Sequence, residues 1–401
     1  MLGLERMMAH IRCDAAIIGA GVIGMSTAYE LSKRKKKVVV IDKVVMGAGA
    51  SGSCDDMILL QSKKPGILLE MAFKSLELYE KLSKELPFDI EFERRGGTIL
   101  IEDQAQLSVM EEFVASQNKH GLGVEIIDAK WLKKLQPHVS SHVIASTYCA
   151  KDSQANPMAL MKAYYLVAVS MGMEFMRKTA PIEISNASGC WNLALDNGDK
   201  VEAGAIVNAT GAWANDINGL VGFQVPISPR KGQVMVTESI PDIGITNVWS
   251  AQYIVSKLKP TQIASDSSLA DKYGLGFAFT GTKSGNYLVG STRENAGFDR
   301  STNPEALALL ARQVSSFFPI MKKINFIRSF AGLRPSTPDG MPFLGELPGR
   351  TGFFIAAGHE GDGIALAPVT GVLIADLVEG RKPEFSMDGF NPGRFETKMG
   401  R

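Results

Sequence analysis

An apolar run near the start of the chain predicts a buried β-strand. Residues 13–18 read Cys-Asp-Ala-Ala-Ile-Ile and lead directly into Gly-Ala-Gly-Val-Ile-Gly at 19–24. An unbroken apolar run is typical of a parallel strand that is covered on both faces. Residues 25–36 then predict a helix, and Val-Val-Val-Ile at 38–41 predicts a second strand that ends at Asp42. Strand, glycine-rich turn, helix and strand in this order predict a Rossmann-type dinucleotide-binding unit.

Each part of this unit has a physical role. Gly19 permits the tight turn, Gly21 lets the backbone approach a pyrophosphate, and Gly24 lets the helix pack closely on the strand. The start of the helix offers N–H groups and a positive dipole end to phosphates, and Asp42 can accept hydrogen bonds from a ribose diol. The residues predicted to hold the dinucleotide here are Gly19, Gly21, Val22, Ile23, Gly24, Asp42 and Lys43.

The glycine pattern occurs a second time at residues 47–52, with Glu70 at the distance of a second ribose-binding acid. No regular helix follows it before Pro65, and no clear strand leads to Glu70. We therefore interpret the second match as a loop and expect one dinucleotide site.

Further along the chain, short apolar segments bounded by glycine or charge predict strands at 98–101, 234–236 and 287–290. Residues 364–377 are apolar, contain Pro368 and follow a glycine-rich segment. This pattern predicts a helix whose N-terminus points at the cofactor.

Composition excludes several classes of protein. With 401 residues, 45% hydrophobic and 21% charged, the chain is an ordinary globular protein of about two to three domains. A net charge of +1 gives no attraction to nucleic acid or to an anionic membrane, and we interpret the basic run 33–37 as a solvated helix end. The four cysteines lie far apart, which favours neither disulfides nor a metal site. The start lacks a signal peptide's apolar core, and no apolar stretch approaches the roughly 18 residues of a membrane helix. We expect a cytoplasmic protein.

Several later segments resemble one family. The strand and small-residue turn at 206–213 resemble the second FAD-contacting turn of the D-amino-acid oxidase-like superfamily, which includes glycine and sarcosine oxidases. Ala50-Ser51-Gly52 resembles the loop that follows the family's ribose-binding acid. Further similar segments are 152–157, 229–233, 332–340, 358–364 and Arg394-Phe395. The resemblance spans nearly the whole chain.

This resemblance implies an α/β fold with FAD, and no nicotinamide, as the cofactor. A Rossmann-type FAD-binding domain would comprise residues 1–80, 150–225 and 325–401. A discontinuous α+β substrate domain, built on a mostly antiparallel sheet, would comprise 81–149 and 226–324. The further residues that the resemblance assigns to FAD are Ala50, Ser51, Gly52, Met57, Ala209, Thr210, Gly211, Trp213, Gly332, Arg334, Gly358, His359, Glu360, Gly361, Asp362, Gly363 and Ile364.

The resemblance also implies the chemistry. The family transfers a hydride from the carbon bearing nitrogen of a small amino acid to flavin N5, and water hydrolyses the resulting imine. Arg334 occupies the position of the carboxylate-binding arginine, and its planar fork suits a carboxylate. The alternative is a structural arginine paired with an acid such as Asp339, and Arg230 and Arg328 are weaker candidates. His359 is either a catalytic base or a positioned loop residue, and the role of Glu360 stays open.

Departures from the family pattern bear on the substrate. The cysteine that tethers FAD in monomeric sarcosine oxidases is absent, so FAD binds non-covalently unless Cys54 attaches it. Ala278 replaces a carboxylate-binding tyrosine, and Gly361 replaces a second active-site arginine. We expect a pocket with one cationic anchor and a different or bulkier substrate. Met57 either faces the flavin or only packs.

Residues 62–66 and 358–363 resemble the flavin subunits of multi-subunit dehydrogenases of proline, hydroxyproline, opines and glycine (the cyanide-forming enzyme). The electron acceptor is therefore either oxygen or a partner redox subunit, and the chain is a candidate for a homo- or hetero-oligomer. Two alternatives stay open. One is an FAD-dependent dehydrogenase of a hydroxy acid or polyol, and the other is a flavin subunit that is inactive alone.

Overall fold

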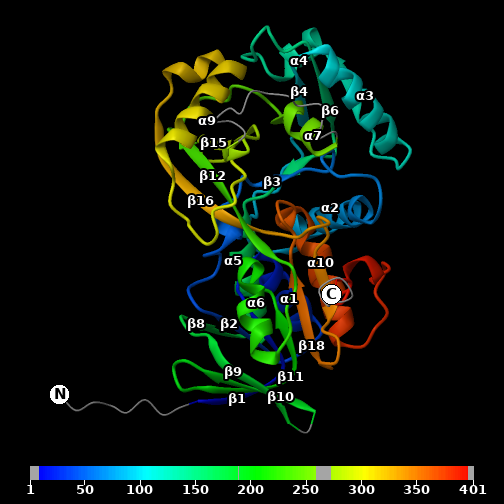
Figure 1. The fold of residues 1–401 in the computed structure, drawn as a ribbon, viewed down its shortest axis with the longest axis vertical. Helices are drawn as coiled ribbons and strands as arrows, with labels where there is room; N and C mark the ends of the chain where they lie inside the picture. The colour runs from blue at the N-terminus through cyan, green and yellow to red at the C-terminus, as the bar shows by residue number, and fades with distance from the viewer. Residues whose placement is uncertain (1–8, 188, 259–271, 396–401) are drawn as a thin grey trace, which may run out of the picture.

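The structure is a computed structural model that describes residues 9–187, 189–258 and 272–395. The strands of these segments form two eight-stranded sheets and one short two-stranded sheet. Figure 1 shows the two large sheets in opposite halves of an elongated molecule, each covered by its own helices.

The first large sheet is built on the predicted βαβ unit. Its strand order is β17-β18-β11-β1-β2-β8, and β10 and β9 extend it from β11. Neighbours from β18 to β8 are parallel, whereas β17, β10 and β9 pair antiparallel. The strands are β1 His10–Ile18, β2 Val38–Asp42, β8 Glu174–Arg177, β9 Pro181–Ala187, β10 Cys190–Leu195, β11 Lys200–Asn208, β17 Phe343–Glu346 and β18 Phe353–Ala357.

Strand β1 is buried on both faces. Ala15 and Ile17 pack into the core on one side of the sheet, and Ala16 and Ile18 pack into the core on the other. This two-sided burial accounts for the unbroken apolar run in the sequence. The helix that follows, α1 (Val22–Lys33), begins three residues earlier than predicted because Gly21 is already its N-cap.

Two helices pack against α1 beside this sheet, α5 (Pro157–Ser170) and α10 (Gly363–Val378), and α2 (Ile67–Glu85) packs against α10. A β-carbon at Gly371 of α10 would lie 2.2 Å from Ser26 Oγ of α1, so glycine permits the close approach of these helices. The predicted apolar helix is confirmed as α10, with Pro368 inside it. The second glycine pattern is a loop, as expected: residues 50–52 form a single 3-10 turn (η1), and Glu70 lies in α2.

The basic run at 33–37 differs from the expected solvated helix end at one position. Arg34 follows the last residue of α1, and its Nη1 lies 2.7 Å from Asp376 Oδ1 and 3.1 Å from Glu379 Oε2. The arginine therefore joins the C-terminal ends of α1 and α10, and its role is structural.

The second large sheet has the order β16-β12-β15-β14-β13-β4-β6-β5. All neighbours are antiparallel except β13 and β4, so the expected mostly antiparallel sheet is confirmed. Its strands are β4 Gly97–Ile101, β5 Glu125–Asp128, β6 Ala145–Cys149, β12 Ser228–Thr237, β13 Asn247–Ser250, β14 Ala278–Gly281, β15 Tyr287–Gly290 and β16 Phe326–Ser336. The helices of this half are α3 Gln104–Asn118, α4 Ala129–Leu135, α7 Ala251–Leu258 and α9 Pro304–Phe317.

The three strands expected from the sequence are β4, part of β12, and β15. The domain boundaries stay a prediction. Strand β16 pairs with β12 in the second sheet, although it follows the boundary that we placed near residue 325. The two-stranded sheet joins β3 (Met57–Ile58) to β7 (Ser153–Gln154) between the two halves.

No helix among the described residues is long and apolar enough to cross a membrane. Within the same ranges there is no cluster of metal-ligating side chains. All four cysteines are free thiols.

Candidate active site

A cavity of about 590 Å³ is lined by residues from both large sheets and from the loops between them. It contains most of the predicted site residues. Three of them, Gly24, Gly52 and Gly358, do not line it. A β-carbon would lie 1.9 Å from Gly19 O at Gly24, 2.3 Å from Gly47 O at Gly52, and 2.7 Å from Thr337 Cγ2 at Gly358. These three glycines instead permit close packing of the turns behind the wall.

The first βαβ turn has the geometry that a bound dinucleotide requires. Gly19 has φ of 105°, and a β-carbon there would lie 2.6 Å from the carbonyl oxygen of Ala209. Any larger residue would therefore push apart the turns that follow β1 and β11. The carboxylate of Asp42 accepts hydrogen bonds from the N–H of Ala20 (2.7 Å) and of Val44 (2.8 Å), which fixes it at the end of β2.

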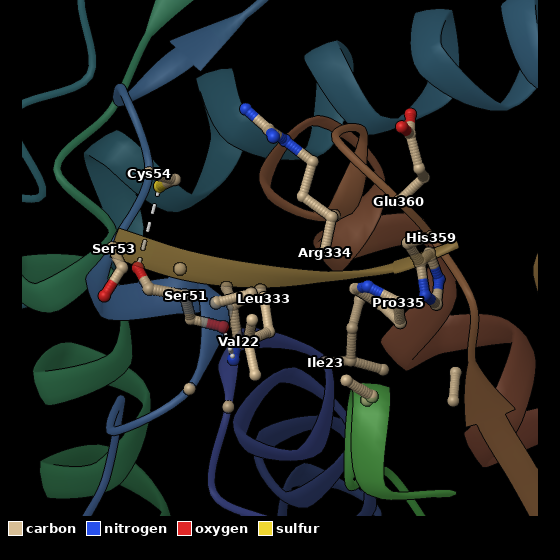
Figure 2. A pocket seen from close by; sticks show the side chains of 18 of the residues that line it. Val22, Ile23, Ser51, Ser53, Cys54, Leu333, Arg334, Pro335, His359 and Glu360 are labelled. Atoms are coloured by element: carbon tan, nitrogen blue, oxygen red, sulfur yellow. Dashed lines mark hydrogen bonds between the residues drawn. The ribbon is translucent and has the colours of Figure 1, made fainter. Parts of the chain in front are cut away.

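Ser51 lies at the N-terminus of α1. Its hydroxyl accepts a hydrogen bond from the N–H of Val22 (2.9 Å), and a β-carbon at Gly21 would lie 3.2 Å from Ser51 Oγ (Figure 2). Helix N-termini with uncapped N–H groups bind phosphates, and Ser51 adds a hydroxyl at this point. The chain's residues thus fit the pyrophosphate of FAD.

The second turn follows β11. Gly211 has φ of 59°, in the left-handed region that glycine adopts without strain. Thr210 donates to Asn208 Oδ1 (2.6 Å), and Asn208 donates to Ala214 O (2.8 Å), so a buried asparagine fixes the turn. Trp213 lines the cavity beside Gly49 and packs against Phe298 at 5.6 Å between ring centroids.

Arg334 lies on β16, and its guanidinium is held by two acceptors. Nη1 donates to Thr292 O (2.9 Å) and Nη2 donates to Ser291 Oγ (2.8 Å). A β-carbon at Gly232 on β12 would lie 2.2 Å from Nη1, so the guanidinium packs directly over this glycine. The alternative pairing with Asp339 is wrong, because both carboxylate oxygens of Asp339 bind the Arg394 guanidinium at 2.8 and 3.1 Å.

His359 is 4% exposed, and its Nε2 lies 3.1 Å from Thr370 Oγ1 of α10. Burial lowers the pKa of His359 to about 4, so the imidazole is neutral at physiological pH. Figure 2 shows Arg334 and Glu360 projecting on one side of β16, whereas His359, Leu333 and Val22 lie on the other.

The same loop, residues 358–363, is tied to the segment after β3. Lys63 is 3% exposed; its Nζ lies 2.8 Å from Asp362 Oδ1 and donates to Leu59 O at 2.9 Å. The sequence showed Lys63 only as part of a family-like segment, because its partner lies 299 residues away.

The departures from the family pattern are visible in the cavity wall. Ala278 and Phe277 both line it on the β14 side. A β-carbon at Gly361 would lie 3.8 Å from Arg334 Nε, so this residue contacts the stem of the arginine. Met57 lines the cavity and is 5% exposed within an apolar cluster, so it packs, and its contact with the flavin stays a prediction.

The expectation of one cationic anchor stays a prediction, and two further arginines lie at the cavity wall. Arg293 and Arg300 line the same cavity as Arg334. Arg293 forms an ion pair with Glu360, and its side chain is 14% exposed. The only sequence signal for Arg293 is its place three residues after a predicted strand, which did not distinguish it from a surface arginine.

Asp55 and Cys54 also line the cavity. Burial raises the pKa of the Asp55 carboxyl, and the positive charge of Arg334 opposes that rise. Burial raises the pKa of the Cys54 thiol well above its usual range, and its Sγ lies 3.6 Å from Ser51 O. A protonated thiol is a poor nucleophile, which supports non-covalent binding of FAD.

A model of the family described as FAD dependent oxidoreductase matches residues 14–377. The chain is 31% identical over 411 residues to glycine oxidase of Geobacillus kaustophilus (strain HTA426), covering 98% of this chain and 100% of that protein. It is 28% identical to the hydrogen cyanide synthase subunit HcnC of Pseudomonas protegens, covering 96% of each. The crystal structure of L-proline dehydrogenase from P. horikoshii superposes with a TM-score of 0.85 at 26% identity, covering 97% of this chain and 99% of that chain.

These matches confirm the resemblance that the motifs indicated. The chain belongs to the family of FAD-dependent oxidoreductases, has FAD as its cofactor and is an enzyme that oxidises amines or amino acids.

Proposed function

We propose that the enzyme oxidises a small amino acid: glycine or a secondary amine such as sarcosine, proline, hydroxyproline or an opine. The observation that carries this proposal is the position of Arg334. Its guanidinium is fixed over Gly232 by Ser291 and Thr292, at the wall of the cavity that the dinucleotide turns also line. A fixed guanidinium binds a carboxylate in bidentate fashion.

In this proposal Arg334 orients the substrate, and the carbon bearing nitrogen lies beside the carboxylate that it holds. Bound FAD supplies the acceptor for the hydride. The N–H groups at the start of α10 line the same cavity, and the positive end of this helix offsets negative charge that develops there.

His359 is assigned a positioning role. A group with a pKa of about 4 is a weak base near neutral pH, and its contact with Thr370 ties the loop at 358–363 to α10. Hydride transfer from an amine that binds in its neutral form needs no dedicated base, so the proposal assigns none to His359.

The test is anaerobic mixing of the purified flavoprotein with a panel of compounds while the visible flavin band is followed. The panel contains glycine, sarcosine, both prolines, hydroxyprolines, opines, common D-amino acids and several hydroxy acids. Bleaching by an amino acid supports the proposal, and bleaching by hydroxy acids alone contradicts it. If no compound bleaches the band, the chain is a flavin subunit that requires a partner.

Admitting air to the bleached sample then identifies the acceptor. Rapid recovery of the band supports oxygen, and slow recovery supports a partner redox subunit. Arg334→Ala is expected to prevent bleaching. Arg230→Ala is the matched control. Arg230 on β12 lies opposite Arg334 in the strand register but does not line the cavity.

A further inference from the structure

The ion pair between Arg293 and Glu360 is the feature of the cavity that the proposed function does not yet use. Both side chains are nearly buried, at 14% and 15% exposed, and both residues line the cavity. Arg293 comes from the segment after β15, whereas Glu360 comes from the loop before α10. The pair therefore links the two halves of the molecule at the active site.

Glu360 is held beside Arg334. The N–H of Glu360 donates to the carbonyl oxygen of Pro335 at 3.0 Å, and Pro335 is the residue next to the arginine. Figure 2 shows the side chains of Arg334 and Glu360 projecting toward the same side of β16. A guanidinium and a carboxylate thus face one region of the cavity.

The backbone of Glu360 is unusual. Its φ is 52°, in the left-handed region that glycine adopts most easily. Gly358 and Gly361 lie in the same loop, yet the position carries a long charged side chain. Strained residues of this kind cluster at sites where the side chain has a function.

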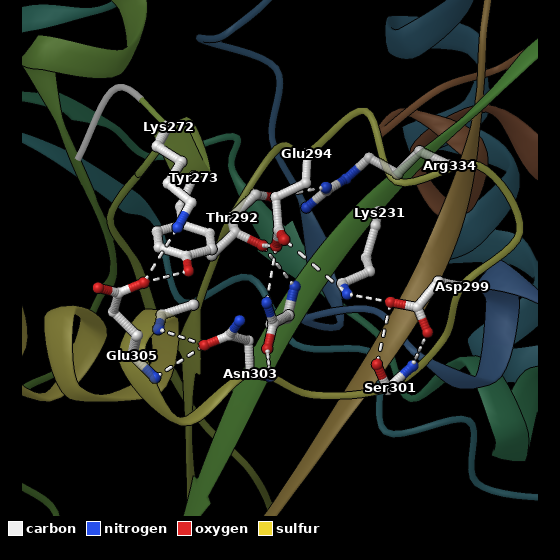
Figure 3. Close-up of polar contacts among 12 residues, drawn as sticks. Lys231, Lys272, Tyr273, Thr292, Glu294, Asp299, Ser301, Asn303, Glu305 and Arg334 are labelled. Atoms are coloured by element: carbon white, nitrogen blue, oxygen red, sulfur yellow. Dashed lines mark hydrogen bonds and ion pairs between the residues drawn. The ribbon is translucent and has the colours of Figure 1, made fainter. Parts of the chain in front are cut away.

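The two neighbours of Arg293 in the chain are anchored by hydrogen bonds, and Figure 3 shows the network around Thr292 and Glu294. Thr292 provides the carbonyl that binds Arg334, and the Glu294 carboxylate accepts from Gln233 Nε2 at 2.7 Å. The backbones of Glu294 and Lys231 exchange two hydrogen bonds of 2.9 Å, and Lys231 Nζ lies 2.8 Å from Asp299. One anchored segment therefore positions both arginines.

We propose that the Glu360 carboxylate accepts hydrogen bonds from the substrate's amine nitrogen while Arg334 binds its carboxylate. Arg293 is a positioning residue that holds the Glu360 carboxylate at the cavity wall and offsets its charge. An α-amino acid offers one anion and one nitrogen donor a short distance apart, and this pair of side chains matches both. The inference rests on the proposed function and predicts that an amine ligand binds more tightly than an ether analogue, which has no donor at that position.

The test compares ligands that differ only at the nitrogen. Sarcosine is paired with methoxyacetate, and L-proline is paired with tetrahydrofuran-2-carboxylate. Apparent Kd values of the amino acids come from the anaerobic rate of flavin bleaching, and those of the oxygen analogues come from the shift of the flavin spectrum on binding.

Glu360→Gln is expected to weaken binding of the amino acid about tenfold or more, because a hydrogen bond to a charged group is lost, and to leave the oxygen analogue nearly unchanged. Arg334→Ala is expected to weaken both ligands. Glu238→Gln is the matched control, since Glu238 binds Asn325 outside the cavity. Flavin content and melting temperature establish that each variant folds.

Arg293 is tested by rescue. Arg293→Met is expected to reduce affinity for the amino acid selectively, and Arg293→Lys to restore part of it, whereas a purely structural role would affect both ligands equally. Equal weakening of the amino acid and its analogue by Glu360→Gln overturns the inference even if the wild-type flavin is bleached. Failure of every amino acid to bleach the wild-type flavin instead overturns the proposed function.

Discussion

The substitution Gly232→Ala tests the position of the carboxylate anchor without removing any functional group. The added β-carbon would lie 2.2 Å from Nη1, 2.6 Å from Cζ and 2.7 Å from Nη2 of Arg334. Non-bonded carbon and nitrogen atoms pack at roughly 3.5 Å, so the whole guanidinium must move. The φ of Gly232 is outside the left-handed region, so alanine strains only the contact with the arginine.

The magnitude follows from the contacts that are lost. A bidentate carboxylate contact consists of two charge-assisted hydrogen bonds, each about 1.5 kcal/mol at the low end. Loss of about 3 kcal/mol corresponds to roughly 100-fold weaker binding, because about 1.4 kcal/mol is tenfold. Moving the Arg334 side chain also breaks its hydrogen bonds to Ser291 Oγ and Thr292 O.

The assay is the concentration dependence of anaerobic flavin bleaching by the preferred amino acid, together with flavin content. Gly389→Ala is the control, since its β-carbon would meet nothing closer than 3.7 Å and the residue lies outside the cavity. We expect Gly232→Ala to retain FAD and to lose about 100-fold in affinity. An affinity within about threefold of wild type would refute the assignment of Arg334 as the anchor.

Three further predictions concern the cofactor and the stability of the fold. Asp42→Ala is expected to weaken FAD binding about tenfold or more, because the ribose loses a charged acceptor; titration of the apoprotein with FAD measures this. Arg34→Ala removes ion pairs at 2.7 and 3.1 Å between α1 and α10 and should lower unfolding free energy by about 1–2 kcal/mol without changing flavin content, as measured by urea denaturation. Because the pKa of His359 is lowered to about 4, it contributes stability that is fully present above the unfolded-state value near 6.5 and is lost as the pH falls toward 4. Urea denaturation at pH 5 and 7 should therefore show a smaller loss of stability in His359→Gln than in wild type, and an equal loss would contradict this assignment.

The parts of the fold that sequence predicted are those encoded by neighbouring residues. The unit from β1 to β2 is continuous in the chain, and its apolar runs and glycines were sufficient to predict it. The apolar segments likewise indicated β4, β15 and α10. Family resemblance supplied the cofactor and the position of Arg334.

The contacts that were missed join distant segments. Arg334 binds residues more than 40 positions away, and Arg34 binds residues more than 340 positions away. Asp339 is a near neighbour of Arg334 in sequence, which suggested an ion pair between them. In the structure Asp339 lies after the end of β16 and binds Arg394 instead. Arg293 could be recognised only after the segment following β15 was seen beside the loop at 358–363.

The side chains along β16 lie between the cofactor loop and the region proposed to bind the substrate. Successive side chains of a strand point to opposite faces, and Figure 2 shows Leu333 on the side of Ser51 and Val22 and Arg334 on the other. A β-carbon at Gly332 would lie 2.8 Å from Ser53 O, so the strand packs against the cofactor loop at that residue. Gly332 lies on the same face of β16 as Arg334, so this face contacts both the cofactor loop and the region proposed to bind the substrate. Ala278 and Gly361, which stand where the family pattern has polar residues, also line the cavity, and we propose that they change which substrate fits.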